Sequence, residues 1–206
     1  MQFEKIMKDL RQDGYCVLEN ALPDEIAQSL LAEVTSSNID YRQANIGRAQ
    51  DHQLNQSIRS DAIKWINKES PAETLWVEQM ENLRLELNKQ LFLGLFSYES
   101  HFAHYPIGAF YKTHLDAFHG QANRMLSTVY YLNPEWPENA GGELVIYNPE
   151  NHQEEIIRVQ PKLGTLVIFL SEEFPHQVLP ATRPRQSIAG WFRVNNSSHN
   201  KIDPPE

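Results

Sequence analysis

The pattern of apolar and polar positions divides the chain into two halves with different periodicities. In the first half, apolar residues recur at the three- to four-residue spacing of amphipathic helices. Helices are predicted at 2–12, at 23–34 and from Pro71 to about Gly94, with a strand at Tyr15–Leu18. Residues 36–57 are polar and predict no regular element, and Ile58–Ile66 alternates only weakly. The first half is therefore expected to be mainly helical.

After Tyr98 the period shortens to two, and runs rich in β-branched and aromatic residues alternate with turn-forming residues. Eight strands are predicted, at Phe102–Tyr105, Ala109–Leu115, Met125–Leu132, Glu143–Tyr147, Glu155–Val159, Thr165–Leu170, His176–Leu179 and Ser187–Val194. Eight short strands of similar spacing favour a jelly roll or a barrel. The predicted class is α+β, with N-terminal helices supporting a cupin-like β core.

The length of the chain favours one domain, because 206 residues are enough for one sizeable core. We expect a single domain at 1–196, in which 1–97 forms the mainly helical support and 98–196 forms the β core. Residues 197–206 are polar, end in a pair of prolines before Glu206, and predict a flexible tail.

Charge and cysteine content narrow the environment and the partners. The net charge of −9 has the wrong sign for a phosphate-binding surface, so nucleic acid is not an expected partner. The N-terminus is charged where a signal peptide needs an apolar run, and no later run is long enough to span a bilayer, so no membrane partner is expected. The single cysteine, Cys16, lies in an apolar run and predicts a buried, inert thiol in the reducing cytoplasm.

A candidate metal site begins at His114-Leu115-Asp116, at the end of a predicted strand. Residues two apart on a strand share a face, so the imidazole and the carboxylate can converge on one ion. His176 is the favoured third ligand because it stands at the start of another strand, and His119, in a loop, is the alternative. Two histidines and one carboxylate that leave other positions open are typical of non-haem iron(II) oxygenases.

A candidate anion-binding residue follows nine positions after His176. Arg185 opens the last predicted strand, and its planar guanidinium matches a carboxylate in bidentate fashion. The far carboxylate of 2-oxoglutarate requires such a partner. Ser187 shares the strand face with Arg185 and offers an additional hydroxyl.

Each of these residues also has a purely structural interpretation. The H-x-D tripeptide can be a surface pair, His176 a satisfied core histidine, and Arg185 an ordinary surface arginine. The order of the three along the predicted strands is what favours the metal site. Other aromatic residues fit structural roles: His101 and His104 face opposite sides of a strand, His52, His152 and His199 lie in polar stretches, and Trp65, Trp76 and Trp136 are expected to be core or loop anchors.

Several segments resemble one known family. They are Tyr105-Pro106, Tyr111 to Asp116, Arg124 to Asn133, Trp136, Gly141 to Leu144, Pro175 to Val178 and Arg185 to Trp191, with Ile58 to Ile66 upstream. Together they are similar to the prolyl-4-hydroxylase branch of the 2-oxoglutarate oxygenases, above all to the oxygen-sensing prolyl hydroxylases of animals and their bacterial relatives. The likeness covers roughly residues 10–195.

The resemblance implies a double-stranded β-helix that binds Fe(II), 2-oxoglutarate and O2, with ascorbate as a further candidate. It implies that His114, Asp116 and His176 hold the iron. Arg185, Tyr105 and Tyr131 fall at co-substrate positions, although cross-strand packing is an alternative for both tyrosines. Arg124 and Trp191 fall near the substrate groove. Ala189 departs from the family, since the animal relatives carry threonine there, which puts a second hydroxyl beside the co-substrate in doubt.

The function expected from the resemblance is hydroxylation of a prolyl residue in a protein, with succinate and carbon dioxide as co-products. A translation-related protein is a candidate substrate, and a monomer is the favoured state. Hydroxylation of a small molecule such as a free amino acid needs the same metal site and is the first alternative. A zinc hydrolase and a cupin-like metal-binding protein without turnover are alternatives of other classes.

Overall fold

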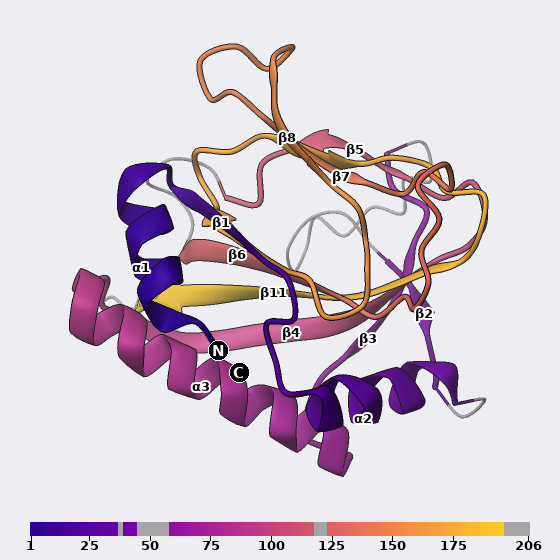
Figure 1. The fold of residues 1–206 in the computed structure, drawn as a ribbon, viewed down its shortest axis with the longest axis horizontal. Coiled ribbons are helices and arrows are strands. Elements are labelled where there is room, and N and C mark those ends of the chain that lie inside the picture. The colour runs from indigo at the N-terminus through magenta and orange to yellow at the C-terminus, as the bar shows by residue number, and fades with distance from the viewer. Residues whose placement is uncertain (37–38, 45–57, 118–122, 196–206) are drawn as a thin grey trace, which may run out of the picture.

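Two antiparallel sheets face each other in the computed structural model, and three helices cover the outer face of the larger sheet (Figure 1). The structure describes residues 1–36, 39–44, 58–117 and 123–195. The predicted tail, much of the polar stretch 36–57, and His52, His119 and His199 lie outside these ranges. Among the described helices, none is long and apolar enough to cross a membrane.

The elements follow the two halves that the sequence predicts. The helices are α1 (Phe3–Gln12), α2 (Asp24–Thr35) and α3 (Pro71–Leu91). The strands are β1 (Tyr15–Leu18), β2 (Arg42–Gln43), β3 (Ala62–Trp65), β4 (Leu95–Tyr105), β5 (Tyr111–His114), β6 (Arg124–Tyr131), β7 (Leu144–Tyr147), β8 (Glu155–Val159), β9 (Leu166–Leu170), β10 (His176–Val178) and β11 (Arg185–Val194). The eight predicted C-terminal strands correspond to β4 through β11.

The strand order places the long central strands of the larger sheet opposite the smaller one. The larger sheet runs β1-β9-β6-β11-β4-β3-β2 and the smaller one β5-β10-β7-β8, with every named pairing antiparallel. Strands β4 and β11 pair along almost their whole length, from Arg185 opposite Tyr105 to Val194 opposite Leu95. This arrangement agrees with the predicted jelly roll.

Alternation along the strands separates two apolar cores. On the helical side, outward residues of the larger sheet such as Phe102, Ile188 and Phe192 pack with Trp76, Met80 and other buried side chains of the helices. Cys16 belongs to this core, and burial raises the pKa of its thiol to about 12, in agreement with an inert group. Between the sheets a smaller core is formed by residues such as Val167, Phe169, Leu144 and Ile146. The inner faces also carry the polar residues of the predicted site.

The predicted end of the long helix and start of the next strand are wrong by several residues. Helix α3 ends at Leu91, because Phe92 adopts a left-handed conformation with φ 55°. The Asn88 side chain bonds both backbone groups of Leu95, accepting from its N–H and donating to its carbonyl, and so turns the chain directly into β4. Strand β4 therefore starts seven residues before the predicted Phe102.

The weakly alternating stretch 58–66 contains the short strand β3, and one expectation there is wrong. Trp65 is 42% exposed and is no core anchor. It lies opposite His101 in the pairing of β3 with β4 and contacts that imidazole edge-on. Trp76 and Trp136 are buried, as expected.

Candidate metal centre and anion pocket

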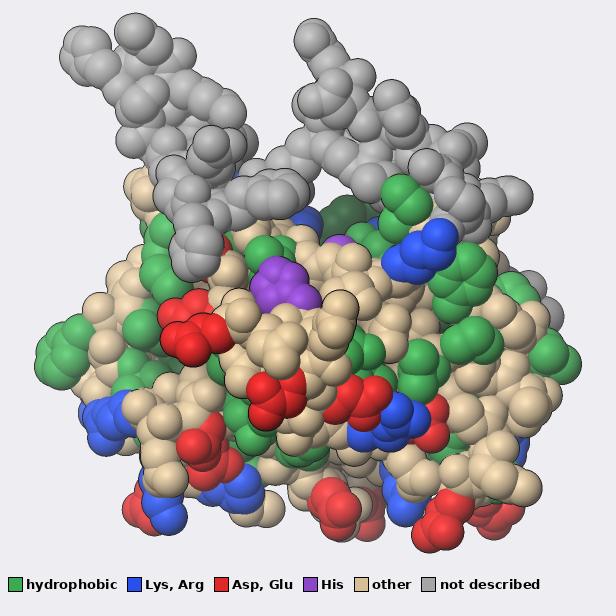
Figure 2. Space-filling model, turned by 90° about the horizontal axis from the view of Figure 1, so that it is seen from above, with side chains coloured by type: hydrophobic (Ala, Val, Ile, Leu, Met, Phe, Trp, Pro, Cys, Tyr) green, Lys and Arg blue, Asp and Glu red, His purple; other side chains and the backbone are tan. Residues whose placement is uncertain are grey.

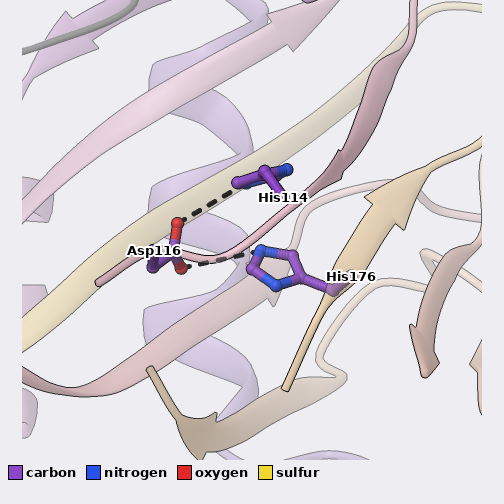
Figure 3. Close-up of side chains that lie close together, drawn as sticks. All are labelled: His114, Asp116 and His176. Atoms are coloured by element: carbon purple, nitrogen blue, oxygen red, sulfur yellow. Dashed lines mark ion pairs between the residues drawn. The ribbon is translucent and has the colours of Figure 1, made fainter. Parts of the chain in front are cut away.

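The side chains of His114, Asp116 and His176 converge between the two sheets (Figure 3). Their ligand atoms all lie within 4.8 Å of one another. His114 Nε2 lies 3.5 Å from Asp116 Oδ1, and His176 Nε2 lies 3.6 Å from Asp116 Oδ2. His114 ends β5 and His176 begins β10, and the two residues pair directly across these strands. Asp116 lies two residues beyond the strand, so a bend rather than a shared strand face brings it to the site.

Backbone and hydroxyl groups orient all three side chains. His114 Nδ1 lies 2.8 Å from the Lys112 carbonyl, and His176 Nδ1 lies 3.0 Å from the Phe174 carbonyl. A proton on each Nδ1 satisfies these carbonyls and leaves both Nε2 lone pairs directed at the centre. The Ser127 hydroxyl donates to Asp116 Oδ2 at 2.6 Å, which fixes the carboxylate.

The electrostatics favour ligands in their metal-binding protonation states. Burial, and after it the charge of His114, lowers the pKa of His176 to about 4, so this imidazole is neutral near pH 7. Burial alone would raise the pKa of the Asp116 carboxyl. The two imidazoles and the hydrogen bonds outweigh burial and hold that pKa well below its usual value. A neutral imidazole and an ionised carboxylate are the forms that bind a cation.

A stack of side chains supports His114 from outside the ligand set. The Tyr111 ring lies parallel to the imidazole, with centroids 3.6 Å apart and an interplanar angle of 15°. The guanidinium of Arg59 lies 4.5 Å from the centroid of the Tyr111 ring and forms a two-bonded ion pair with the fully buried Asp61. This chain of contacts restricts the orientation of the metal-site imidazole.

The three ligands open into a cleft of about 1140 Å³ between the sheets. Besides the ligands, the cleft is lined by Arg185, the first residue of β11, and by Trp191, six positions further along the same strand. Between them, three inward positions of β11 and β4 are small, Ser187, Ala189 and Ala103, which leaves space open, whereas His101 on β4 also faces the cleft and is large. Figure 2 shows histidine side chains reaching the surface on the face of the molecule that it presents.

Arg185 is buried at one end of this cleft, with 1% of its surface exposed. Its Nε donates to the Gly142 carbonyl at 2.9 Å and its Nη1 to the Ser187 hydroxyl at 3.2 Å. Gly142 has φ +77°, and an added Cβ would lie 3.0 Å from the Ala181 side chain, so this close approach requires glycine. Within the described ranges of the chain, no carboxylate forms an ion pair with this guanidinium. A buried cation without a counter-ion is unfavourable, and an anionic ligand in the cleft would supply the counter-ion for Arg185.

The two predicted co-substrate tyrosines flank Arg185 in different ways. Each ring centroid lies 4.9 Å from the guanidinium carbon. Tyr105 lines the cleft, and burial raises the pKa of its phenol, so it remains a hydrogen-bond donor at neutral pH. Tyr131 is fully buried within the core between the sheets, opposite Ser187 on β11. Its placement fits the packing interpretation as well as a ligand contact.

The two predicted substrate-side residues form a stacked pair at the other end of the cleft. The Arg124 guanidinium lies 3.6 Å from the centroid of the Trp191 ring. Its Nε and Nη2 both donate to Glu99 Oε1, at 2.9 and 2.7 Å. Arg124 shares this carboxylate with Arg193, whose Nη1 lies 3.4 Å from Glu99 Oε2, and its two bonds to Glu99 hold it flat against the indole, which suits an orienting role toward Trp191.

The donor set fits an iron(II) ion. The protein offers two imidazole nitrogens, from β5 and β10, and one carboxylate, from the bend after β5. The remaining coordination positions of the metal are left to ligands in the cleft. The buried, uncompensated Arg185 fits the far end of a dicarboxylate in the same cleft.

The chain belongs to the 2OG-Fe(II) oxygenase superfamily, whose family model matches residues 100–193. It is similar to a prolyl-4-hydroxylase of Pseudomonas putida, with 37% identity and a TM-score of 0.84 over 94% of this chain and all of that one. The fold and family implied by the resemblance, a double-stranded β-helix of the prolyl hydroxylase type, are therefore confirmed.

Curated relatives extend beyond this chain. It is 29% identical to Egl nine homolog 1 of Homo sapiens, covering 93% of this chain but 46% of that protein. The chain spans about half the length of the first of these relatives. A prolyl hydroxylase from Trichoplax adhaerens, solved with a peptide of hypoxia inducible factor, is 24% identical with a TM-score of 0.79 and supports the fold.

Sequence reasoning missed several residues that surround the metal site. These residues are Ser127 on β6, Tyr111 on β5, and the Arg59–Asp61 pair in the segment before β3. The sequence does contain a sign of the Arg59–Asp61 pair, because opposite charges two residues apart can form an ion pair. Ser127 gave none, since only the register of β6 brings it to Asp116.

Proposed function

We propose that the chain is an Fe(II)- and 2-oxoglutarate-dependent dioxygenase that hydroxylates a prolyl residue of a protein substrate. The observation that carries the proposal is the buried guanidinium of Arg185, which shares one cleft with the His114, Asp116 and His176 cluster and has no carboxylate partner in the part of the chain described. A dicarboxylate that chelates a metal at one end and pairs with an arginine at the other fits both features.

In this proposal His114, Asp116 and His176 hold the iron. Iron(II) with O2 and 2-oxoglutarate supplies the oxidation, in which one oxygen atom enters a C–H bond and the co-substrate becomes succinate and carbon dioxide. Arg185 binds the far carboxylate through the side of its guanidinium not used by Gly142 and Ser187. From the neighbouring strand β4, the Tyr105 hydroxyl donates a hydrogen bond to the same ligand.

The shape of the cleft supports a separate place for the substrate. Trp191 lies six positions after Arg185 along β11, a length of about 20 Å, which exceeds that of a five-carbon dicarboxylate. The end near Trp191, Trp65 and Arg124 is therefore available to a second molecule. The relatives named as prolyl hydroxylases favour a prolyl residue there.

Succinate formation tests this function. The protein is incubated with iron(II), 2-oxoglutarate, O2 and either a proteome digest or free amino acids, and products are analysed by mass spectrometry. We expect succinate that depends on both iron and 2-oxoglutarate, and an added oxygen on peptidyl proline. Oxygen added to free amino acids alone would favour the small-molecule alternative, and the absence of any co-substrate turnover would refute the proposal.

We also propose four more detailed properties of this enzyme. Ascorbate as a reductant, a cytoplasmic location, a monomeric state and a translation-related substrate rest on the resemblance and on composition. A single catalytic domain at 1–196 is supported by the packing of α1, α2 and α3 in one core with the larger sheet.

A further inference from the structure

His101 lies on the inner face of β4 and lines the cleft without taking part in the metal or anion site. Its side chain is 97% buried, and no hydrogen-bond partner for Nδ1 occurs in the described structure. Its ring contacts the Trp65 ring at 5.1 Å and the Trp191 ring at 5.4 Å between centroids. Leaving a buried polar atom unsatisfied is unfavourable, so this nitrogen is expected to have a ligand.

Strand register places His101 beside an opening. It stands between Trp65 on β3 and Ala189 on β11, and all three share the inner face. Because Ala189 ends at Cβ, the space on that side of the imidazole is open to the cleft.

The same register keeps His101 away from the metal ligands. Ser127, which holds Asp116, lies two strands away, about 10 Å across the sheet. His101 is therefore placed to bind a part of the substrate several bonds from the oxidised carbon, and not to touch the oxidant.

The indole of Trp191 adds a second unsatisfied group at this end. Its Nε1 is buried and also has no hydrogen-bond partner in the described ranges. An indole N–H can only donate, whereas a neutral imidazole offers one lone pair. Burial, and after it the positive charge of Arg59, lowers the pKa of His101 to about 3, so the ring is neutral near pH 7. With the imidazole proton on Nε2, the pair presents one donor, the indole N–H, and one acceptor, His101 Nδ1.

We propose that His101 and Trp191 bind the peptide group that follows the target prolyl residue: the indole N–H donates to a carbonyl oxygen, and the His101 imidazole accepts the next N–H. This proposal rests on the proposed function and names the substrate class of that site. Proline nitrogen carries no hydrogen, so the N–H adjacent to a prolyl residue is the one on its C-terminal side. A free amino acid would bring a carboxylate there, which has no N–H for the imidazole.

A pair of blocked peptides tests the assignment. One is acetyl-Ala-Ala-Pro-Ala-Ala-amide, and in the other L-lactic acid replaces the alanine after proline, so an ester oxygen stands in place of the N–H. Dissociation constants are measured by titration calorimetry under argon with protein loaded with iron(II) and 2-oxoglutarate. We expect the unsubstituted protein to prefer the amide, and His101→Leu to reduce that preference about tenfold.

Control variants separate the roles of the two residues. Trp191→Phe keeps a ring but loses the donor, so it should weaken both peptides while the preference for the amide persists. His104 lies on the opposite face of β4, where its side chain contacts Gln186. His104→Leu should therefore keep the preference for the amide peptide. The unfolding temperature of His101→Leu should not fall below that of the unsubstituted protein, because an apolar side chain replaces one with an unsatisfied polar atom.

The outcomes distinguish this inference from the proposed function. An amide preference that is unchanged in His101→Leu, or binding of neither peptide by the unsubstituted protein, would overturn the assignment of the peptide group. Iron- and 2-oxoglutarate-dependent succinate formation, assayed in the same preparation without peptide, reports on the dioxygenase itself. The dioxygenase proposal fails only where that turnover is missing.

Discussion

At Arg185 the protein buries a positive charge that its described side chains do not neutralise. The guanidinium is held by a carbonyl and a hydroxyl, both neutral acceptors, and so retains its full charge for a ligand. Arginine suits this position better than lysine because two of its donors can be committed to the protein while others remain for a carboxylate.

Arg185→Lys should weaken 2-oxoglutarate binding about tenfold or more, because one ammonium cannot bond Gly142, Ser187 and a carboxylate with the same geometry. The measurement is the dissociation constant of 2-oxoglutarate in the presence of metal. Arg183→Lys is the matched control, since Arg183 contacts the Trp136 ring and a backbone carbonyl at an exposed position. Equal affinity of Arg185→Lys and the unsubstituted protein would remove Arg185 from the co-substrate site.

Ser127→Ala should lower metal affinity about 10- to 100-fold, because the hydrogen bond that orients Asp116 is lost. Anaerobic titration with iron(II) measures this effect. Ser171→Ala is the control: its hydroxyl bonds Ser127 at 2.9 Å and acts on Asp116 only through it, so a smaller loss is expected. A larger loss in Ser171→Ala than in Ser127→Ala would contradict this order.

Among the elements, the junction of α3 with β3 holds one edge of the cleft. Glu73 in the first turn of α3 is fully buried, pairs with Lys64 on β3, and accepts the backbone N–H groups of Asn67 and Glu69. This single carboxylate fixes the connection that places Trp65 at the mouth of the cleft.

Glu73→Leu should lower the free energy of unfolding by about 3–5 kcal/mol, because two backbone donors lose their buried acceptor and Lys64 keeps only the more exposed Glu69 as a partner. Urea unfolding measures the change. Lys89→Met, which removes an exposed ion pair with Glu86, should leave the free energy of unfolding nearly unchanged. Similar values for the two variants would show that the buried pair has no structural role.

Sequence patterns predicted most elements because their signals are local. Alternation over four to ten residues located β5 to β9 within a few residues, and the proline at the start of α3 located that helix. The end of α3 could not be predicted, since Phe92 carries no signal for a left-handed conformation and the side chain of Asn88 acts seven residues away. Trp65 was misjudged because its burial depends on which strand lies next to it.

At the scale of the whole molecule, the candidate metal centre and the candidate anion pocket lie between two sheets and draw on strands from both. The order of His114, Asp116, His176 and Arg185 along the chain was enough to predict these residues as a group. Distances could not be predicted, nor could the contacts of Ser127, because they depend on long-range register.

Ligands that bind between the sheets should stabilise the entire fold. At 100 times its dissociation constant, 2-oxoglutarate adds about 2.7 kcal/mol, which corresponds to a rise of roughly 5–10 °C in the unfolding temperature for a chain of this size. Differential scanning fluorimetry under argon measures it. We expect the shift to require the metal and to be much smaller in Arg185→Lys. Removing the metal with a chelator should abolish it, and an equal shift without metal would contradict joint binding in one cleft.

Because inward and outward side chains alternate along β4 and β11, one pair of strands serves two purposes that can change independently. Positions 101, 103 and 189 face the cleft, whereas their neighbours Phe102 and Ile188 belong to the core against the helices. A directed-evolution library confined to the inward positions would therefore vary substrate preference while the scaffold is inherited intact. Gene duplication followed by divergence at every second residue offers the same route to new specificities.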